Sequence, residues 1–133
     1  MAFVADNSVA IAWFVAGQAD ATTDAWLDRA AAEAVHVPFI WRAEFASALL
    51  TLAHNRRLPP SRVPAILDAI DRLELVEDAT PPPLRLLVDM SRRHALSAFD
   101  ASYLELALRL NLPLAARDAP LRKAAGHAGV ALQ

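Results

Sequence analysis

Short apolar runs alternate with segments of helical periodicity along this chain, and this alternation restricts the fold more than any other feature. Each run is a few residues long and is followed by a stretch in which apolar side chains recur at i, i+3 and i+4. Strands separated by helices need crossover connections, which give parallel pairing with helices on both faces of the sheet. The sequence therefore predicts an α/β fold, a three-layer α/β/α sandwich around a short parallel sheet of four or five strands. The candidate strands are Phe3–Ala5, Val35–Val37, Leu73–Val76, Leu112–Ala116 and Val130–Leu132.

The helices expected between these strands have recognisable starts and apolar stripes. Ser8 is the expected N-cap of a first helix over Val9–Phe14, because a hydroxyl can accept a hydrogen bond from a free N–H of the first turn. Ser61 is the expected cap of a later helix with Val63, Ile66, Leu67 and Ile70 on one face. Two further helices are expected to begin at Thr22 or Thr23 and at Ser97, and two more to span Trp41–Asn55 and Ala119–Ala125. Another is expected to run from Pro81–Pro83 to His94, with Leu84, Leu87 and Val88 facing inward.

Length and composition favour one domain, residues 1–133, without disulfides or a membrane span. The chain has 133 residues and no cysteine, which excludes disulfides and thiolate metal sites and fits a reducing cytoplasm. The apolar N-terminus has no basic residue before it and is interrupted by Asp6, so it does not read as a signal peptide. No apolar run is long enough to cross a bilayer. The 56% hydrophobic content fits both a helix-rich core with many alanines and apolar surface covered by a partner.

Four carboxylates fall where parallel strands end or where the following helices begin. Asp6 and Asp118 follow two predicted strands, while Glu44 and Asp100 lie in the first turns of two predicted helices. Each also has a local explanation, such as helix capping or the S-x-x-D pattern that Ser97 and Asp100 form. Together they imply more, because two like charges about 4 Å apart repel by roughly 4 kcal/mol at an effective dielectric near 20. A fold that gathers them needs a cation or raised pKa values.

The ligand chemistry of these four residues favours Mg²⁺, with Mn²⁺ as a second possibility. All the candidate ligands are carboxylate oxygens, the donors that hard divalent cations prefer. The four histidines lie at no ligand spacing from one another or from these acids, which argues against zinc.

The segments that carry these acids resemble a known family. In order and spacing they are similar to the PIN-domain nucleases, above all to the VapC-type toxins of bacterial toxin–antitoxin systems. The likeness covers essentially the whole chain, and its four segments together are specific. They are Val4–Phe14, Pro38–Leu49, Ser97–Tyr103 and Leu114–Asp118.

The resemblance implies a Mg²⁺- or Mn²⁺-dependent endoribonuclease. By it, Asp6, Glu44 and Asp100 match the three most constant acids of the family, and Asp118 matches a fourth, more variable one. The resemblance also makes Ser8 a supporting residue beside the first acid. Ala116 departs from the pattern, since the family usually has Thr or Ser two residues before the fourth acid, and this leaves the role of Asp118 open.

The resemblance further implies an RNA substrate, a VapB-type antitoxin and a homodimer. The apolar helices over Ala43–Ala53 and Val63–Ile70 are the expected partner-facing surfaces. A net charge of −2 is unusual for an RNA-binding protein, but removing four metal-bound acids from the fifteen leaves eleven acidic against thirteen basic residues. Arg42 and Arg117 are the strongest candidates for phosphate contacts, because each lies within two residues of a proposed ligand. The other candidates are Arg92, Arg93, Arg122 and Lys123, for which plain solvated surface is the alternative.

Two other functions fit parts of the pattern. An aspartate-based phosphoryl-transfer protein also places Asp at strand ends, but the phosphatase type needs a second Asp where Ser8 stands. The receiver type needs a late-strand Lys, and Lys123 lies on a predicted helix. A non-catalytic PIN-like binding module is weakly favoured by Ala116 and disfavoured by the presence of all four acids.

Overall fold

A computed structural model describes residues 1–132 and contains a short parallel sheet. Its four strands lie in the order β3-β2-β1-β4, and every neighbouring pair is parallel. The register places Val4 opposite both His36 and Leu114, so β1 is central. The strands are β1 (Phe3–Ala5), β2 (Val35–Val37), β3 (Leu75–Glu77) and β4 (Leu114–Ala115).

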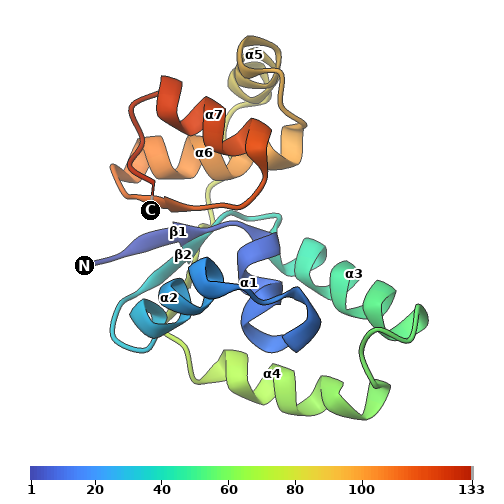
Figure 1. Cartoon of the computed structure of the whole chain (residues 1–133). Helices are drawn as coiled ribbons and strands as arrows, with labels where there is room; N and C mark the ends of the chain where they lie inside the picture. Colours follow the sequence, from blue (N-terminus) through green and yellow to red (C-terminus); the bar gives the residue numbers. More distant parts are fainter. Residues whose placement is uncertain (133) are drawn as a thin grey trace.

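Helices cover both faces of this sheet, which confirms the predicted three-layer sandwich (Figure 1). One layer contains α1 (Asn7–Phe14), α2 (Ala21–Ala30), α3 (Trp41–His54) and α4 (Val63–Asp71). The other contains α5 (Leu84–His94), α6 (Ala98–Leu110) and α7 (Ala119–His127). Two single-turn 3₁₀ segments, η1 (Ala16–Gln18) and η2 (Pro60–Arg62), complete the described elements. Within residues 1–132, no helix is both long and apolar enough to cross a membrane.

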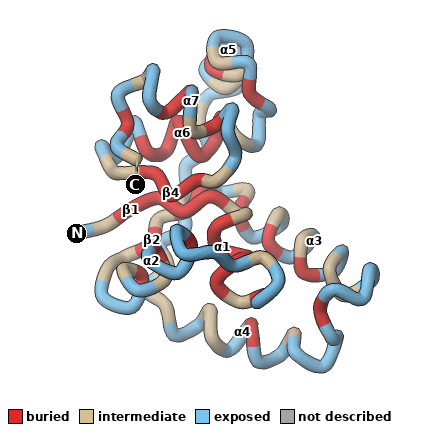
Figure 2. The backbone as a smooth tube through the Cα atoms, in the orientation of Figure 1, coloured by how far each residue is buried: buried red, intermediate tan, exposed pale blue. Residues whose placement is uncertain are grey.

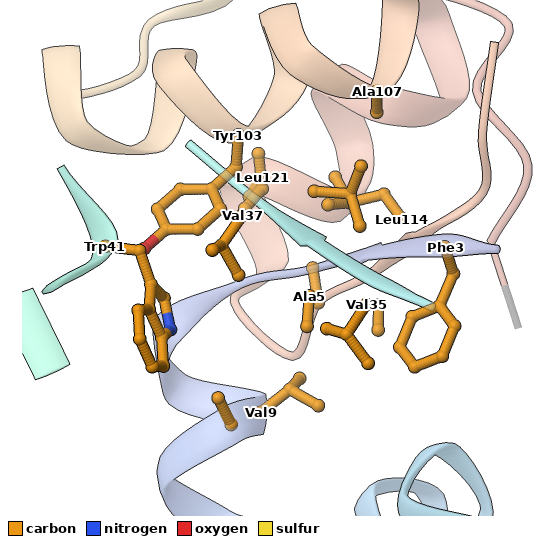
Figure 3. Close-up of a cluster of buried hydrophobic side chains, with 14 of the residues drawn as sticks. Phe3, Ala5, Val9, Val35, Val37, Trp41, Tyr103, Ala107, Leu114 and Leu121 are labelled. Carbon is orange, nitrogen blue, oxygen red and sulfur yellow. The ribbon is translucent and has the colours of Figure 1, made fainter. Parts of the chain in front are cut away.

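The core lies on both sides of β1, so this strand reads as a continuous apolar run rather than an alternating one. Leu121 and Ala107 cover one side of the sheet and Val9 covers the other, as Figure 3 shows. The ring of Phe3 lies 4.6 Å from that of Trp26, centroid to centroid. Burial of each such large apolar side chain contributes about 1.5–3 kcal/mol. The central strand, and the residue that follows it, are therefore held firmly.

The predicted fifth strand at Val130–Leu132 is wrong for the part of the chain that the structure describes. The N–H of Val130 donates to Ala125 O, and Gly129 has a φ of +79°, so this segment closes the C-terminus of α7. One bond, from Leu114 N–H to Ala131 O, reaches β4 without extending the sheet. The third and fourth strands are also shifted or shorter than predicted, at Leu75–Glu77 and Leu114–Ala115.

Three predicted helix starts are also wrong. Asp6, not Ser8, caps α1, and Asp20 caps α2 by accepting from the N–H of Thr23 at 2.8 Å. Ser61 lies inside η2, and α4 begins with no side-chain cap. At α1 and α2 several neighbouring polar residues could act as the cap, and the path of the preceding loop decides which one does.

The predicted inward face of α5 is only partly correct. Met90 is buried and Leu87 half-buried, but Leu84 is 77% and Val88 49% exposed. The reason is visible in Figure 2, where α5 lies at the margin of the molecule and only one narrow stripe of it is covered. Leu67 on α4, predicted on the apolar face, is likewise 49% exposed.

Candidate active site at the carboxyl edge of the sheet

The four predicted acids come from two adjacent strands and from helices on both faces of the sheet. Asp6 follows β1 and Asp118 lies three residues after β4, which pairs with β1. Glu44 stands in the first turn of α3, and Asp100 in the first turn of α6. Parallel strands present their carboxyl ends at one edge, so these positions converge there. We call Asp6, Glu44, Asp100 and Asp118 the acidic cluster.

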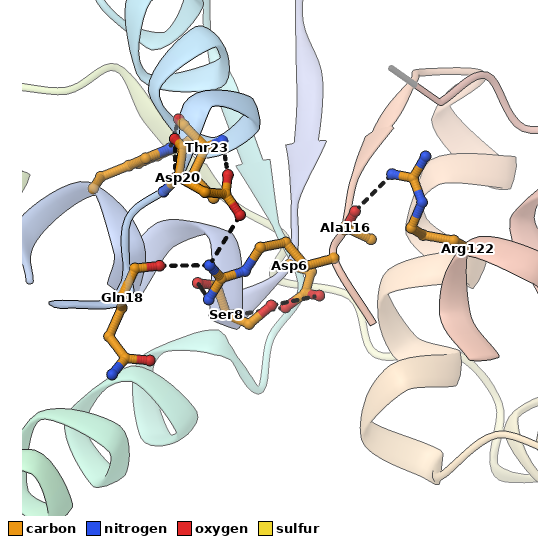
Figure 4. Close-up of polar contacts among 9 residues, drawn as sticks. Asp6, Ser8, Gln18, Asp20, Thr23, Ala116 and Arg122 are labelled. Atoms are coloured by element: carbon orange, nitrogen blue, oxygen red, sulfur yellow. Dashed lines mark hydrogen bonds and ion pairs between the residues drawn. The ribbon is translucent and has the colours of Figure 1, made fainter. Parts of the chain in front are cut away.

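Asp6 is the buried member of the cluster. Its side chain is only 6% exposed, and both of its carboxylate oxygens accept hydrogen bonds from Ser8. The backbone N–H of Ser8 donates to Oδ1 at 2.6 Å and its hydroxyl to Oδ2 at 3.1 Å (Figure 4). Burial raises the pKa of Asp6 to about 6; the bonds from Ser8 oppose this, and the nearby charges of Asp100 and Glu44 add to it.

The remaining acids are linked by mutual repulsion. Burial raises the pKa values of Glu44 and Asp100; Asp100 adds to the shift at Glu44, and Asp118 adds to the shift at Asp100. Asp6, Glu44 and Asp100 therefore lie within electrostatic reach of one another, and Asp118 within reach of Asp100. The carboxylate of Asp118 also caps α7 by accepting from the N–H of Leu121 at 3.3 Å.

Tyr103 is a site residue that the sequence did not reveal. It lies on α6 and is only 1% exposed, and its hydroxyl donates to Glu44 Oε1 at 2.7 Å. Burial and the surrounding carboxylates raise the pKa of Tyr103, so the phenol keeps its proton and remains a donor. Its place three residues after Asp100, on the same side of a helix, was the available signal. The apolar spacing of this helix predicted only a core role for it.

The donors at this edge suit a hard divalent cation. They are carboxylate oxygens, and the buried side-chain oxygen of Asn7, the neighbour of Asp6, has no hydrogen-bond partner in the described part of the chain. Within residues 1–132, however, no three His, Cys, Asp or Glu side chains lie close enough together to form a ready-made chelating group. Asp6 and Glu44 are instead turned toward their own donors, Ser8 and Tyr103. Shared coordination of one ion would require some of these side chains to rotate.

A hollow of about 650 Å³ opens beside the cluster. Asn7, Ser8 and Glu44 are among its polar lining residues, and Phe99, which is 58% exposed and precedes Asp100 in the sequence, also lines it. Small residues of α3, among them Ala48 and Thr51, form much of the remaining wall. We call it the acid-side hollow; it offers the Glu44 carboxylate, the Arg117 guanidinium, one aromatic side chain and apolar surface together.

Both predicted phosphate contacts are bound to the protein itself. Arg42 makes two bonds to Glu77, Nε to Oε1 at 3.0 Å and Nη2 to Oε2 at 2.8 Å. Arg117 donates to the carbonyl oxygens of Gln18 and Ser8 and lies 3.6 Å from the Asp20 carboxylate (Figure 4). A phosphate would compete with these partners, and RNA contact by either arginine stays a prediction.

Ala116 is buried at the end of β4, and its carbonyl oxygen accepts from Arg122 at 2.9 Å. Its methyl group offers no hydroxyl toward Asp118, so the departure seen in the sequence stands. The backbone of this segment is held by Arg122 all the same.

Comparisons with known proteins agree with this architecture. The family model described as "PIN domain" matches residues 3–127. Among solved structures, PAE2754 from Pyrobaculum aerophilum superposes with a TM-score of 0.71 at 20% identity, covering 99% of this chain and 83% of that one. FitAcB from Neisseria gonorrhoeae superposes with a TM-score of 0.64 at 18% identity, covering 99% and 96%. A comparison with curated sequences gives no match. The family match extends over nearly the whole chain, and the protein therefore belongs to the PIN domain family, whose members are generally nucleases.

Proposed function

We propose that this PIN domain is a metal-dependent endoribonuclease of the VapC toxin type, which hydrolyses RNA phosphodiesters. The observation that supports this most strongly is the acidic cluster, in which Asp6 is buried beside Glu44 and Asp100 at the cost of a pKa raised to about 6. A purely structural cap does not need a second and third carboxylate nearby. A divalent cation would offset the repulsion among them.

Asp6, Glu44 and Asp100 are the proposed ligands of Mg²⁺ or Mn²⁺, and Asp118 is proposed to serve from the margin of the site. When bound, such a cation supplies a water of lowered pKa and neutralises charge that develops on the phosphate. The protein's own contribution is orientation. Ser8 fixes the carboxylate of Asp6, and Tyr103 holds Glu44 through its hydroxyl.

An antitoxin of the VapB type is the proposed regulator, and its proposed position is along α3. The acid-side hollow leads from Glu44 along this helix. A second hollow of about 590 Å³ lies between α3 and α4, lined by apolar residues including Trp41, Phe45 and Ile70. Leu50, 68% exposed on α3, and Leu67 on α4 add uncovered apolar surface. An amphipathic segment would bury both. The proposed assembly of the toxin itself is a homodimer.

The direct test is cleavage of RNA by the purified chain in Mg²⁺ or Mn²⁺. We expect Asp6→Asn and Asp100→Asn to reduce the rate by at least ~100-fold, more than the 10–100-fold that changes outside the ligand shell cost. Arg62→Gln, a change on an exposed residue outside the acidic cluster, is the matched control and should leave the rate unchanged. Single-stranded DNA of the same sequence is the substrate control. Wild-type rates in both Asn variants would refute the assignment.

A non-catalytic PIN-like module is the second candidate, favoured by the lack of a ready-made chelating group within residues 1–132. One experimental outcome distinguishes this module from the ribonuclease. A folded wild-type chain that binds RNA but cleaves none, in either Mg²⁺ or Mn²⁺, would be a non-catalytic module.

A further inference from the structure

A third hollow, of about 560 Å³, lies between the end of α5 and α7 and is lined by basic side chains. Arg93 and His94 come from the last turn of α5, and Lys123 and His127 from successive turns of α7. The rest of its wall is Ala95, Ala119, Pro120 and Ala124, so no carboxylate of the described residues 1–132 lines it. We call this the basic hollow. It differs in kind from the acid-side hollow and from the α3–α4 hollow, which contain Glu44 and Glu77.

The basic side chains of the basic hollow have few partners within the protein. Within residues 1–132, the side chains of His94, Lys123 and His127 make no hydrogen bond or ion pair. Arg93 pairs with Asp89 one turn earlier, and the two side chains are 65% and 54% exposed. Exposed pairs of this kind contribute about 0–1 kcal/mol, so an incoming anion can displace Asp89. Arg42 and Arg117, by contrast, are held by Glu77 and by backbone carbonyls.

The basic hollow shares its backbone with the acidic cluster. Ala119 and Pro120, in its wall, directly follow Asp118 in the first turn of α7. Ala95, also in its wall, leads within a few residues to Asp100 in the first turn of α6. Figure 1 shows α5, α6 and α7 together on one side of the sheet. A polyanion bound through a cation at Asp100 and Asp118 would therefore lie near this hollow.

We propose that the basic hollow binds a backbone phosphate of the substrate RNA, away from the phosphodiester that is cleaved. The proposal rests on the ribonuclease function above and assigns part of its substrate binding. A nucleic-acid strand carries one negative charge at every phosphodiester, so a site that engages one phosphate brings neighbouring phosphates with it. Arginine and lysine provide the positive charge, and the two imidazoles add donors. Such contacts position the strand without reading its sequence.

The test is equilibrium binding of a short single-stranded RNA to the chain carrying Asp6→Asn, which prevents cleavage during the measurement. Fluorescence anisotropy at several salt concentrations gives both the Kd and the dependence of log K on log salt. Each phosphate contact contributes about 0.7 to that slope for single strands. Adding Arg93→Gln and Lys123→Gln should weaken binding at least several-fold and lower the slope by roughly 0.7, since one phosphate contact is lost. The matched control, Arg62→Gln with Arg72→Gln, removes the same charge from η2 and the end of α4 and should leave the slope unchanged.

The outcomes separate this assignment from the proposed function. If the chain with intact acids cleaves RNA, and the Arg93/Lys123 variant keeps the unaltered Kd and slope, the basic hollow is not an RNA site although the ribonuclease stands. If the chain neither binds nor cleaves RNA, both proposals fail. If poly-glutamate binds in a Lys123-dependent way and more tightly than RNA of equal charge, the occupant is an acidic protein segment and the RNA assignment is overturned.

Discussion

Asp6 combines two demands on one side chain. As the N-cap of α1 it accepts from the N–H of Ser8, and this accounts for its place directly after β1. As a buried carboxylate near Glu44 and Asp100 it is unfavourably charged in the absence of a cation. The first role stabilises the fold, and the second is what the proposed metal site requires.

Because Asp6 is a buried carboxylate, the stability of the fold should depend on pH with a definite sign. The pKa of Asp6 lies at about 6 in the fold against 3.8 for the unfolded reference, so between these values the folded state binds more protons. The free energy of unfolding should therefore decrease as pH rises from about 4 to above 6, by about 1–3 kcal/mol. Glu44 and Asp100, with raised pKa values, contribute in the same direction.

Urea unfolding in EDTA at about pH 5 and pH 7.5 measures this dependence. Asp6→Asn should keep the cap, since its amide oxygen still accepts from Ser8, and should flatten the pH profile. An identical profile in wild type and Asp6→Asn would show that the buried charge of Asp6 carries no such cost.

Tyr103 is expected to act through Glu44 rather than on the substrate. Tyr103→Phe keeps the buried ring and removes the donor at 2.7 Å from Glu44 Oε1. We expect about 1 kcal/mol of lost stability, and a 10–100-fold lower cleavage rate with a higher metal concentration for half-maximal rate. Ser102→Ala is the matched control, because Ser102 is buried on the same helix and bonds Ala98 O instead. Equal losses of cleavage in both variants would mean that Tyr103 is merely structural.

At the scale of elements, Arg117 connects three segments that are distant in sequence. It follows β4, and its guanidinium contacts backbone carbonyls in α1 and η1 and the Asp20 carboxylate that caps α2. The pKa of Asp20 is lowered mainly by the hydrogen bond from the N–H of Thr23, and the positive charge of Arg117 lowers it further. The segment around Asp118 is thereby fastened to the opposite helical layer.

Arg117→Gln should therefore lower the free energy of unfolding by about 1–2 kcal/mol, since bonds from a charged donor to partly buried carbonyls are lost. Arg42→Gln is the comparison, because its pair with Glu77 is on the surface, with the Arg42 side chain 79% exposed, and should cost at most about 0.5 kcal/mol. Chemical denaturation measures both. A negligible effect of Arg117→Gln would show that its contacts do not hold these elements together.

The elements that the sequence predicted well are those whose signal is local. Apolar runs such as Val35–Val37 and the stripe through Phe45 and Leu49 reveal strand and helix through their own spacing. The exposure of Leu84 could not be predicted in this way, because α5 has an apolar face whether or not another element covers it. Asp6 and Asp20 were not predicted as helix caps for a similar reason, because the path of the preceding loop decides which of several adjacent polar residues caps the helix.

The same distinction applies to the candidate site. Asp6, Glu44, Asp100 and Asp118 were recognisable because strand ends and helix starts are readable along the chain. The role of Tyr103 could not be recognised from the sequence. Its hydroxyl lies within an apolar stripe, and only the packing of α3 against α6 brings Glu44 within hydrogen-bond distance of it. Arg93 and Lys123 were among the candidate phosphate contacts, but the hollow that they share could not be predicted, because it forms only when α5 and α7 pack around α6.

At the scale of the whole molecule, the net charge of −2 hides a separation of charge. Carboxylates gather at the edge where β1 and β4 end, and basic groups gather between α5 and α7 on the adjoining surface. This arrangement fits a protein that holds a cation at one place and a phosphate chain beside it. Uncovered apolar surface on α3 and α4 leaves a separate region for a protein partner.

Everything proposed here depends on whether side chains separated by nearly the whole sequence can share one divalent cation. Isothermal titration calorimetry of the purified chain with Mn²⁺ tests this directly. We expect saturable binding that is lost in Asp6→Asn and weakened at least ~10-fold in Glu44→Gln, with Ser102→Ala unchanged. Absence of saturable binding, or binding of equal strength in Asp6→Asn, would contradict the account.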